Sequence, residues 1–395
     1  MRIESVDFYY LAIPEIRDIG DGSQDALLVR VRSDSGHEGW GECEASPLVS
    51  IAAWCAPMSH SACKPVGRTV RGARIGTPDD IRALNAEVRR QSLDLLQADH
   101  TLSGVDMALW DLLGRVRGEP AWRLLGWERA YPKTAYASML FGETPEETRA
   151  KARTVRDTGF QAVKFGWGPF GIDPERDEAH VRAARDGLGP GRMLMVDAGT
   201  VWGADVDAAS RRLSFLMECD VTWLEEPFVS GALAAYQELE NRIRRSGGTL
   251  RTAAGEGSHE PFMARNLVDF GNVGYIQVDA GRIGGLTSAV EVARYAEARG
   301  VRYVNHTFTT PLALSGSLQP FAGLEGSHIC EYPVEPSALA STLTVERFDL
   351  DGEGRIRLPD RPGLGITPDH RTITRYLQNV EIRIGERTIY RSPGI

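Results

Sequence analysis

Three short apolar runs within residues 192–256 each lead into a carboxylate, and this pattern limits the possible folds more than any other feature of the chain. The runs are MLMVDAG, VTWLEEP and LRTAAGEG, which bring Asp197, Glu225 with Glu226, and Glu256 to their ends. Helix-length segments separate them. This alternation is typical of consecutive strands in a parallel sheet that is buried on both faces.

In a closed barrel built from such strands, neighbouring strand ends converge on the carboxyl face. Asp197, Glu225 and Glu256 would then repel one another unless a cation lay among them. Hard oxygen ligands favour magnesium, calcium or manganese. The pattern therefore predicts a divalent metal site, and the alternative is three unrelated solvated strand ends.

The barrel pattern extends over the second part of the chain, from about Lys133. Eight strand candidates follow one another at fairly regular intervals: AYASML, AVKF, MLMVD, VTWLEEP, LRTAAGE, YIQVD, RYVNH and HICEY. Short strands alternating with amphipathic helices indicate a (β/α) barrel. A chain of 395 residues can hold one barrel of about 250 residues and a smaller unit.

The smaller unit is expected at the start of the chain. Residues 1–43 read as three antiparallel strands, with turns at Asp21-Gly22 and Ser35-Gly36. Thr77 and Pro78 predict the start of a helix that runs to about Leu96. A second helix is expected over SGVDMALWDLLGRVRGEPAWRLLG, with Ser103 as its cap and Gly118 near its end.

Two stretches of this first part look irregular. Residues 15–25 are polar and contain glycine, and residues 46–76 are long and carry several basic side chains. Long loops of this kind are functional lids or ordinary surface loops, and the sequence leaves both open. After Tyr332 the chain becomes rich in proline and glycine, and LDGEGRIRLPDRPGLG is expected to cross back toward the small domain as an extended tail.

Charge and composition exclude several classes of partner. The formal net charge of −9 argues against a general nucleic-acid or anionic-membrane surface, although a local cationic pocket for an acidic substrate remains open. No apolar run approaches 18 residues, and the start lacks a signal-peptide pattern, so we expect a cytoplasmic location. The five cysteines are scattered without paired metal-ligand spacing and are read as reduced thiols.

Four further strand ends carry groups suited to acid, base and oxyanion roles. The second strand leads to Lys164, the sixth to Asp279, the seventh to His306 and the eighth to Glu331. On adjacent strands Asp279 would accept a hydrogen bond from one imidazole nitrogen of His306 and turn the other toward the metal. This pair is interpreted as a general-base dyad, with Lys164 adding positive charge across the barrel mouth.

A glycine motif after the second strand resembles a dinucleotide fingerprint. Residues 166–171 read GWGPFG and match G-x-G-x-x-G. A dinucleotide-binding helix must open inside the motif, yet Pro169 and Pro174 place the helix start near Asp173. Nicotinamide and flavin cofactors are therefore not expected. The run is better read as a loop that brings backbone and Trp167 close to a substrate, or as a simple turn.

Taken in this order, these residues resemble the mandelate racemase and muconate-lactonizing branch of the enolase superfamily over nearly the whole chain. The resemblance implies an α+β capping domain over residues 1–130, a modified TIM barrel, (β/α)7β, over 131–345, and a tail over 346–395 that packs back toward the cap. It also implies one Mg²⁺ held by Asp197, Glu225 and Glu256, and removal of a proton beside a substrate carboxylate. In such a site Asp279 and His306 would act as the base, and Lys164 and Glu331 would contact the substrate carboxylate.

The chain departs from the family pattern at two positions. Family racemases carry a second lysine two residues after the first, and Gly166 stands there in this chain. Some related dehydratases place His or Asn two residues after the first metal ligand, where this chain has Gly199. One dyad suffices for elimination but not for racemisation by two bases, so elimination is favoured. By analogy, the dyad alone implies the R configuration at C2 of the substrate.

The sequence therefore predicts a magnesium-dependent sugar-acid dehydratase that converts an aldonate into a 2-keto-3-deoxy acid. A racemase, epimerase or cycloisomerase of the same branch is the alternative, and a non-catalytic metal-binding barrel is a third. The expected partner is a small sugar acid, with no nucleic acid or membrane, in a homo-oligomer. His60 and His259 are candidates for positions near the pocket, although a surface role suits each.

Overall fold

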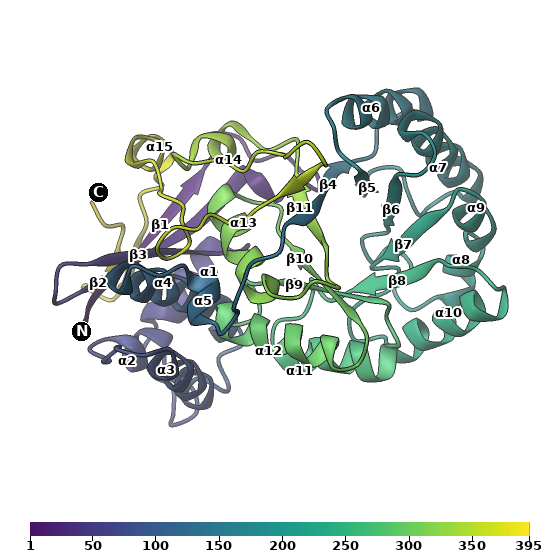
Figure 1. Cartoon of the computed structure of the whole chain (residues 1–395). Helices are drawn as coiled ribbons and strands as arrows, with labels where there is room; N and C mark the ends of the chain where they lie inside the picture. The colour runs from purple at the N-terminus through teal and green to yellow at the C-terminus, as the bar shows by residue number, and fades with distance from the viewer. Residues whose placement is uncertain (395) are drawn as a thin grey trace.

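The computed structural model describes residues 1–394, and the chain begins with a small antiparallel sheet (Figure 1). Its strands are β1 (Ile3–Ala12), β2 (Asp25–Ser33) and β3 (Glu38–Cys43), paired in the order β1-β2-β3. The three-stranded unit predicted for residues 1–43 is confirmed. A short 3-10 turn, η1 (Gly22–Gln24), closes the loop that joins β1 to β2.

Five helices follow this sheet, and two of them change the reading of residues 46–76. The helices are α1 (Pro47–Cys55), α2 (Val66–Val70), α3 (Pro78–Gln91), α4 (Ala98–Arg117) and α5 (Ala121–Leu124). The expectation of one long irregular stretch over residues 46–76 was wrong, since α1 and α2 lie within it. Helix α3 starts at the predicted cap, where Thr77 and Asp80 form a capping box.

The boundary between the two long helices differs from the prediction. Helix α3 ends at Gln91, five residues before Leu96, and α4 already begins at Ala98. Ser103 is therefore not a cap. It lies inside α4, where its hydroxyl donates to Asp99 O at 2.8 Å and accepts from the backbone N–H of Gly284 at 2.8 Å. A polar side chain that looked like a helix start instead bonds helix to barrel.

Eight parallel strands form a barrel, which lies at the centre and right of Figure 1. They are paired in the order β10-β9-β8-β7-β6-β5-β4-β11. Between β10 and β11 the side chain of Asn305 bridges the gap, because its Oδ1 accepts from the N–H of Glu331 at 2.9 Å. The strands are β4 (Lys133–Leu140), β5 (Ala162–Gly166), β6 (Met193–Asp197), β7 (Val221–Glu225), β8 (Arg251–Ala254), β9 (Tyr275–Asp279), β10 (Arg302–His306) and β11 (Ile329–Pro333).

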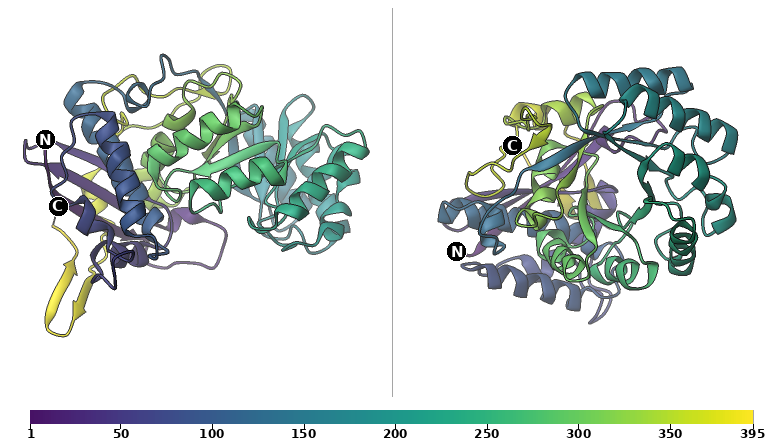
Figure 2. Two further views of the ribbon diagram at one scale, coloured as in Figure 1. Left: turned by 90° about the horizontal axis from the view of Figure 1, so that it is seen from below. Right: turned by 45° about the vertical axis from the view of Figure 1, so that its right-hand side comes forward.

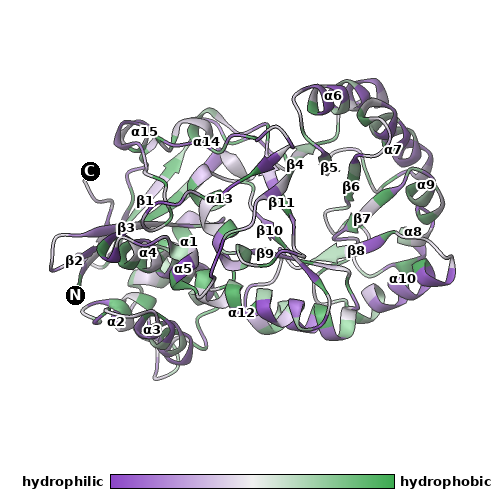
Figure 3. Cartoon of the chain, viewed as in Figure 1, coloured by the Kyte–Doolittle hydropathy of each residue, from purple (hydrophilic) through white to green (hydrophobic). Residues whose placement is uncertain are grey.

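Helices surround the barrel, and their inner faces cover its outer surface. In Figure 3 helix α10 shows both hydrophobic and hydrophilic colours, and its buried face includes Tyr236, Leu239 and Ile243. The helical segments are α6 (Pro145–Asp157), α7 (Pro174–Leu188), α8 (Val206–Ser210), α9 (Leu213–Glu218), α10 (Leu233–Arg245), α11 (Pro261–Asn266), η2 (Leu267–Gly271), α12 (Gly285–Glu297), α13 (Pro311–Leu318) and η3 (Gln319–Phe321). The predicted α/β barrel beside an α+β unit is confirmed. No helix within residues 1–394 is long and apolar enough to cross a membrane.

The chain then returns to the first sheet, as the two views in Figure 2 show. Asp111 of α4 joins the parts, since its carboxylate accepts from the N–H of Trp40 at 2.8 Å and from that of Leu364 at 2.7 Å. Tyr390 donates to Phe8 O at 2.7 Å. The last elements are α14 (Ala338–Thr342), β12 (Arg355–Ile356), which pairs with β4, α15 (His370–Tyr376), and the hairpin β13 (Glu381–Ile384) with β14 (Arg387–Arg391).

Candidate active site

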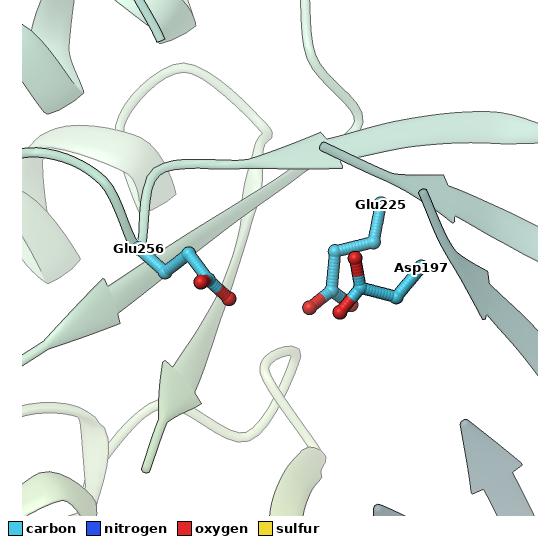
Figure 4. A group of neighbouring side chains, drawn as sticks. All are labelled: Asp197, Glu225 and Glu256. Carbon is cyan, nitrogen blue, oxygen red and sulfur yellow. The ribbon is translucent and has the colours of Figure 1, made fainter. Parts of the chain in front are cut away.

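Three carboxylates gather at the carboxyl ends of neighbouring barrel strands. Asp197 ends β6, Glu225 ends β7 and Glu256 follows β8, and Figure 4 shows their carboxyl groups turned toward a common point. One oxygen from each lies within 4.8 Å of the other two. All three side chains are largely or fully removed from solvent. A set of only carboxylate oxygens at this spacing suits a hard divalent cation, so the residues fit the expected Mg²⁺.

Lys164, in the middle of β5, lies against the same group. Its ammonium Nζ contacts Glu225 Oε1 in a short ion pair, lies 3.0 Å from Glu331 Oε1, and lies 3.4 Å from Asp197 Oδ2. Burial alone would lower the pKa of Lys164, but the carboxylates of Glu225 and Glu331 raise it well above its ordinary value. Lys164 therefore stays positively charged in a buried position beside the three metal-ligand candidates.

Glu331 stands behind Lys164 and is fully buried. Its Oε1 also accepts from the hydroxyl of Ser138 at 2.8 Å, and its Oε2 accepts from the N–H of Thr307 at 2.6 Å. Burial alone would raise the pKa of Glu331, but Lys164 and His306 hold it below its usual value. Because both of its oxygens accept hydrogen bonds, Glu331 is better placed to hold Lys164 than to donate a hydrogen bond to a substrate.

The predicted dyad has the geometry of a hydrogen-bonded pair. Nδ1 of His306 lies 2.7 Å from Asp279 Oδ2, and its Nε2 lies 3.1 Å from Glu256 Oε2, on the side of the carboxylate group. The other oxygen of Asp279 accepts from the N–H of Gly281 at 2.6 Å, which fixes the carboxylate. Burial alone would lower the pKa of His306, but Glu256, Glu331 and the bond to Asp279 raise it to about 10.

These groups open onto one cavity of about 280 Å³. Lys164, Asp197, Glu256 and His306 line it, together with residues of the predicted loops 15–25 and 166–171 and others that the sequence did not single out. The further lining residues are Ile19, Gly20, Asp21, Gly22, Glu44, Ser138, Met139, Leu140, Gly166, Trp167, Arg282 and Phe308. The loop before β2 thus reaches the cavity, which favours the lid interpretation of residues 15–25 over an ordinary surface loop. None of the residues lining it belongs to 46–76, so this structure gives that stretch no part in the cavity wall.

Glu44 and Arg282 are the most notable residues that the sequence reading missed. The guanidinium of Arg282 pairs with the carboxylate of Glu44 and donates to Glu256 O at 3.1 Å. The N–H of Glu44 donates to Gly281 O at 3.1 Å. This pair joins the first sheet to the barrel directly beside the dyad. No sequence signal marks Glu44, and only its position in the fold reveals it. Arg282 could have been noticed, because it lies three residues after Asp279 in VDAGR.

Trp167 lies at the cavity as expected. Its side chain is 48% exposed and its φ of +58° is in the left-handed region, which is unusual for a bulky residue. Gly20 of the loop and Gly199 after β6 both lie against the indole ring, since a Cβ on either would come within 3.1 Å of it. Helix α7 begins only at Pro174, beyond the glycine run, which agrees with the rejection of a dinucleotide site.

The two other histidines have different surroundings. His60 is exposed, with Nε2 3.5 Å from Asp94 Oδ2, and does not line the cavity. Nδ1 of His259 lies 2.7 Å from Nε2 of the buried His100, so this pair joins α4 to the loop after β8. His259 does not line the cavity.

Gly166 lies directly against a metal-ligand candidate. A Cβ on Gly166 would come within 2.7 Å of Asp197 Cβ. Such contacts are not tolerated without a shift of the backbone. A side chain at position 166, where the family resemblance places a second lysine in racemases, would therefore require β5 or Asp197 to shift.

Two family descriptions match the chain. Residues 20–126 match the mandelate racemase and muconate lactonizing enzyme N-terminal domain, and residues 147–372 match the enolase C-terminal domain-like family. Among curated relatives, a D-galactarolactone cycloisomerase from Agrobacterium fabrum is 28% identical over 89% of this chain and 90% of its own length. An L-rhamnonate dehydratase from Saccharopolyspora erythraea is 29% identical over 86% of this chain and 82% of its own length.

Solved structures share the fold. A predicted mandelate racemase from Rhodobacter sphaeroides superposes with a TM-score of 0.94 at 54% identity, covering 100% of both chains. A racemase from Streptomyces coelicolor, solved with bound magnesium, has a TM-score of 0.79 at 26% identity, covering 95% of this chain and 100% of its own. The relatives thus differ in the reactions for which they are named while sharing one architecture.

Proposed function

The chain belongs to the mandelate racemase and muconate lactonizing enzyme family of the enolase superfamily, and we propose that it dehydrates a sugar acid. The proposed substrate is an aldonate, and the product is a 2-keto-3-deoxy acid. The observation that carries the proposal is a single His306–Asp279 dyad facing three carboxylates, with Gly166 where a second base would stand. Dehydratases among the relatives support the reaction class.

Mg²⁺ would be held by Asp197, Glu225 and Glu256. When bound, it supplies the positive charge that stabilises a carboxylate as its neighbouring carbon loses a proton. Lys164 adds a second fixed positive charge at the same end of the cavity, and Glu331 with Ser138 keeps its ammonium in place. The buried position of these groups strengthens their electrostatic effect, because little water competes with them.

The dyad then moves one proton twice. Mg²⁺ among the carboxylates would offset the charge of Glu256, which raises the pKa of His306, so the imidazole would be neutral in the loaded site. Nε2 of His306 then takes the proton from C2, while Asp279 holds the Nδ1–H and stabilises the imidazolium that forms. The imidazolium returns that proton to the β-hydroxyl as its C–O bond breaks, and water leaves. The resulting enol becomes the 2-keto acid. One acid–base group thus serves both steps, and a substrate with R configuration at C2 presents its proton to this group.

A cycloisomerase is the second candidate, because two curated relatives are named for that activity. The D-galactarolactone cycloisomerase covers 89% of this chain, and a 3,6-anhydro-α-L-galactonate cycloisomerase from Streptomyces coelicolor is 31% identical over 70% of it. The same dyad would remove the proton in either case. The two proposals differ in the group that leaves, a free hydroxyl or a ring oxygen.

Screening purified, magnesium-loaded protein against aldonates, aldarates and their lactones tests the proposal. Formation of 2-keto acid and deuterium exchange at C2 are followed together. A 2-keto product with loss of water from an aldonate supports dehydration. Ring opening without loss of water would move the protein to the cycloisomerases, and exchange or epimerisation without a keto product would contradict elimination.

A further inference from the structure

Asp21 contributes a carboxylate to the cavity from the loop that joins β1 to β2. On one side of it Gly20 packs against Trp167, and on the other a Cβ on Gly22 would lie 3.3 Å from Phe308 O. The loop is therefore held on both walls of the cavity. Asp21 Oδ1 accepts from the N–H of Ser23 at 2.8 Å and from its hydroxyl at 2.6 Å, so the side chain has a defined orientation.

The second oxygen of Asp21 is not engaged. Among residues 1–394, no hydrogen-bond donor contacts its Oδ2, and no Lys, Arg or His nitrogen lies within 4.0 Å of the carboxylate. Asp21 thus differs from the other carboxylates that line the cavity, which contact Lys164, Arg282 or His306. An acceptor without a partner at a cavity wall is suited to hydroxyl donors from a ligand.

The cations of the cavity are already paired with protein carboxylates. Lys164 contacts the metal-ligand candidates and Glu331 at one end. Arg282 pairs with Glu44 and lies 3.8 Å from Glu256 Oε1. Apart from His306, these two residues are the only cationic ones that line this cavity within the described part of the chain. Within the described part of the chain, this cavity therefore has no unpaired lysine or arginine to receive a second anionic group.

We propose that Asp21 determines specificity for monocarboxylic sugar acids, by accepting hydroxyl groups from the end of the substrate remote from its carboxylate and by repelling a second carboxylate there. This inference rests on the proposed function, because the metal site must take the first carboxylate. Like-charge repulsion excludes the diacid, while the hydroxyl groups of the monoacid satisfy the free oxygen. An aldonate is thereby selected over the aldarate that differs from it only by oxidation of the terminal carbon.

Calorimetric binding to the intact, magnesium-loaded protein provides the test, since it does not require turnover. Matched probe pairs are D-gluconate with D-glucarate, D-galactonate with galactarate, and D-xylonate with xylarate. We expect the wild-type protein to bind at least one aldonate roughly tenfold or more tightly than its paired aldarate. Asp21→Asn retains an oxygen that accepts from Ser23 but removes the charge, so the aldarate should gain affinity about tenfold and the difference should shrink.

Asp18→Asn is the matched control, because Asp18 is an exposed residue of the same loop that does not line the cavity. It makes the same change in net charge and should leave the ratio of the two affinities unchanged. Melting temperatures of both variants verify that the loop and the fold are retained.

The possible outcomes separate this inference from the proposed function. Wild-type binding of the aldarates as tight as that of the aldonates, or an unchanged ratio in Asp21→Asn, overturns the role of Asp21. Binding of no acid in any pair overturns it too. A clear preference for an aldonate without any 2-keto product would instead support the role of Asp21 while contradicting dehydration.

Discussion

Gly166 and Asp197 lie so close that a Cβ on the glycine would come within 2.7 Å of Asp197 Cβ. The two residues end adjacent strands and are paired in the register of β5 with β6. The close contact with Asp197, a metal-ligand candidate, thus favours glycine at position 166. This contact links the absence of a side chain at position 166 to the placement of Asp197.

Gly166→Ala should disturb the metal site without adding any reactive group. The new methyl must displace Asp197, so Mg²⁺ affinity and turnover should both fall about tenfold or more. Calorimetric titration with Mg²⁺ and a 2-keto acid assay measure the two effects. Gly231→Ala is the control, because Gly231 is exposed and a Cβ there would meet nothing within 4 Å. Unchanged Mg²⁺ affinity in Gly166→Ala would contradict the close contact.

Replacing the base should separate chemistry from metal binding. His306→Asn removes the group that takes the C2 proton but none of the three carboxylates, so turnover and C2 deuterium exchange should drop by about 10² to 10⁴ or more. Mg²⁺ affinity should change far less. His328→Asn, at an exposed histidine whose Nδ1 lies near Gly326 O, should behave as wild type. C2 deuterium exchange at the wild-type rate in His306→Asn would contradict the role of His306 as the base.

Removing one ligand charge should weaken metal binding and activity together. Glu225→Gln keeps the shape of the side chain but replaces a carboxylate with an amide, which is a poorer metal ligand. It also removes the negative charge that pairs with Lys164. We expect Mg²⁺ affinity to fall about tenfold to a hundredfold, with activity restored in part by excess metal. Glu128→Gln, at an exposed residue far along the chain, serves as control. Full activity of the wild-type protein after removal of all divalent cations would refute the metal site.

The His100–His259 contact should make stability depend on pH. Burial, followed by the neighbouring His259, lowers the pKa of His100 to about 4 from 6.5. The unfolded chain therefore binds a proton at a higher pH than the folded protein does, and stability is lost as the pH falls from 6.5 toward 4. Between pH 7 and pH 5.5 this effect amounts to about 1 kcal/mol.

Urea unfolding at both pH values, for wild type and His100→Asn, checks this contribution. The variant should lose less stability than wild type over the interval, whatever its stability at pH 7. His37→Asn, at an exposed histidine, should follow the wild-type slope. Identical slopes for wild type and His100→Asn would show that the buried pair does not titrate as described.

The indole of Trp167 should restrain the loop that carries Asp21. Trp167→Ala removes the ring against which Gly20 packs, so the loop should open more often. Trypsin should then cleave after the exposed Arg17 several-fold faster than in wild type. Mass spectrometry of the fragments identifies the cut. Phe262→Ala is the control and should be cleaved at the wild-type rate, because its ring is 62% exposed and does not line this cavity. Equal cleavage rates in Trp167→Ala and wild type would mean that the ring does not hold the loop.

The strand ends were predictable because the barrel repeats one local pattern. A short apolar run followed by a polar residue placed Lys164, Asp197, Glu225, Asp279 and His306 near one mouth without any knowledge of their contacts. The fold followed from the same periodicity. Ser103 failed as a cap because its hydroxyl has partners in α4 and at Gly284, and the latter belongs to the barrel. Local sequence cannot reveal a partner that is brought close only by the fold.

The same limit explains which residues of the cavity were missed. Glu44 and Arg282 are far apart in sequence, and their ion pair exists only because the first sheet packs against the barrel. The loop containing Asp21 was recognised as polar, but its free oxygen depends on the orientation set by Ser23. Residues 46–76 were misread although Ser46-Pro47 repeats the Thr77-Pro78 pattern that predicted α3. The start of α1 differs in that Ser46 is left-handed and its side chain caps no backbone N–H.

The return of the chain to its first sheet has a consequence for biosynthesis. Gln378 donates its backbone N–H to Tyr10 O at 2.8 Å, and Tyr390 reaches Phe8, so β1 receives partners that the ribosome adds only after the whole barrel has been made. A nascent chain therefore holds β1 without these contacts throughout translation of the barrel. The cap that carries Asp21 and Glu44 therefore acquires these supports only after the barrel, and a chain that stops at the end of the barrel lacks them.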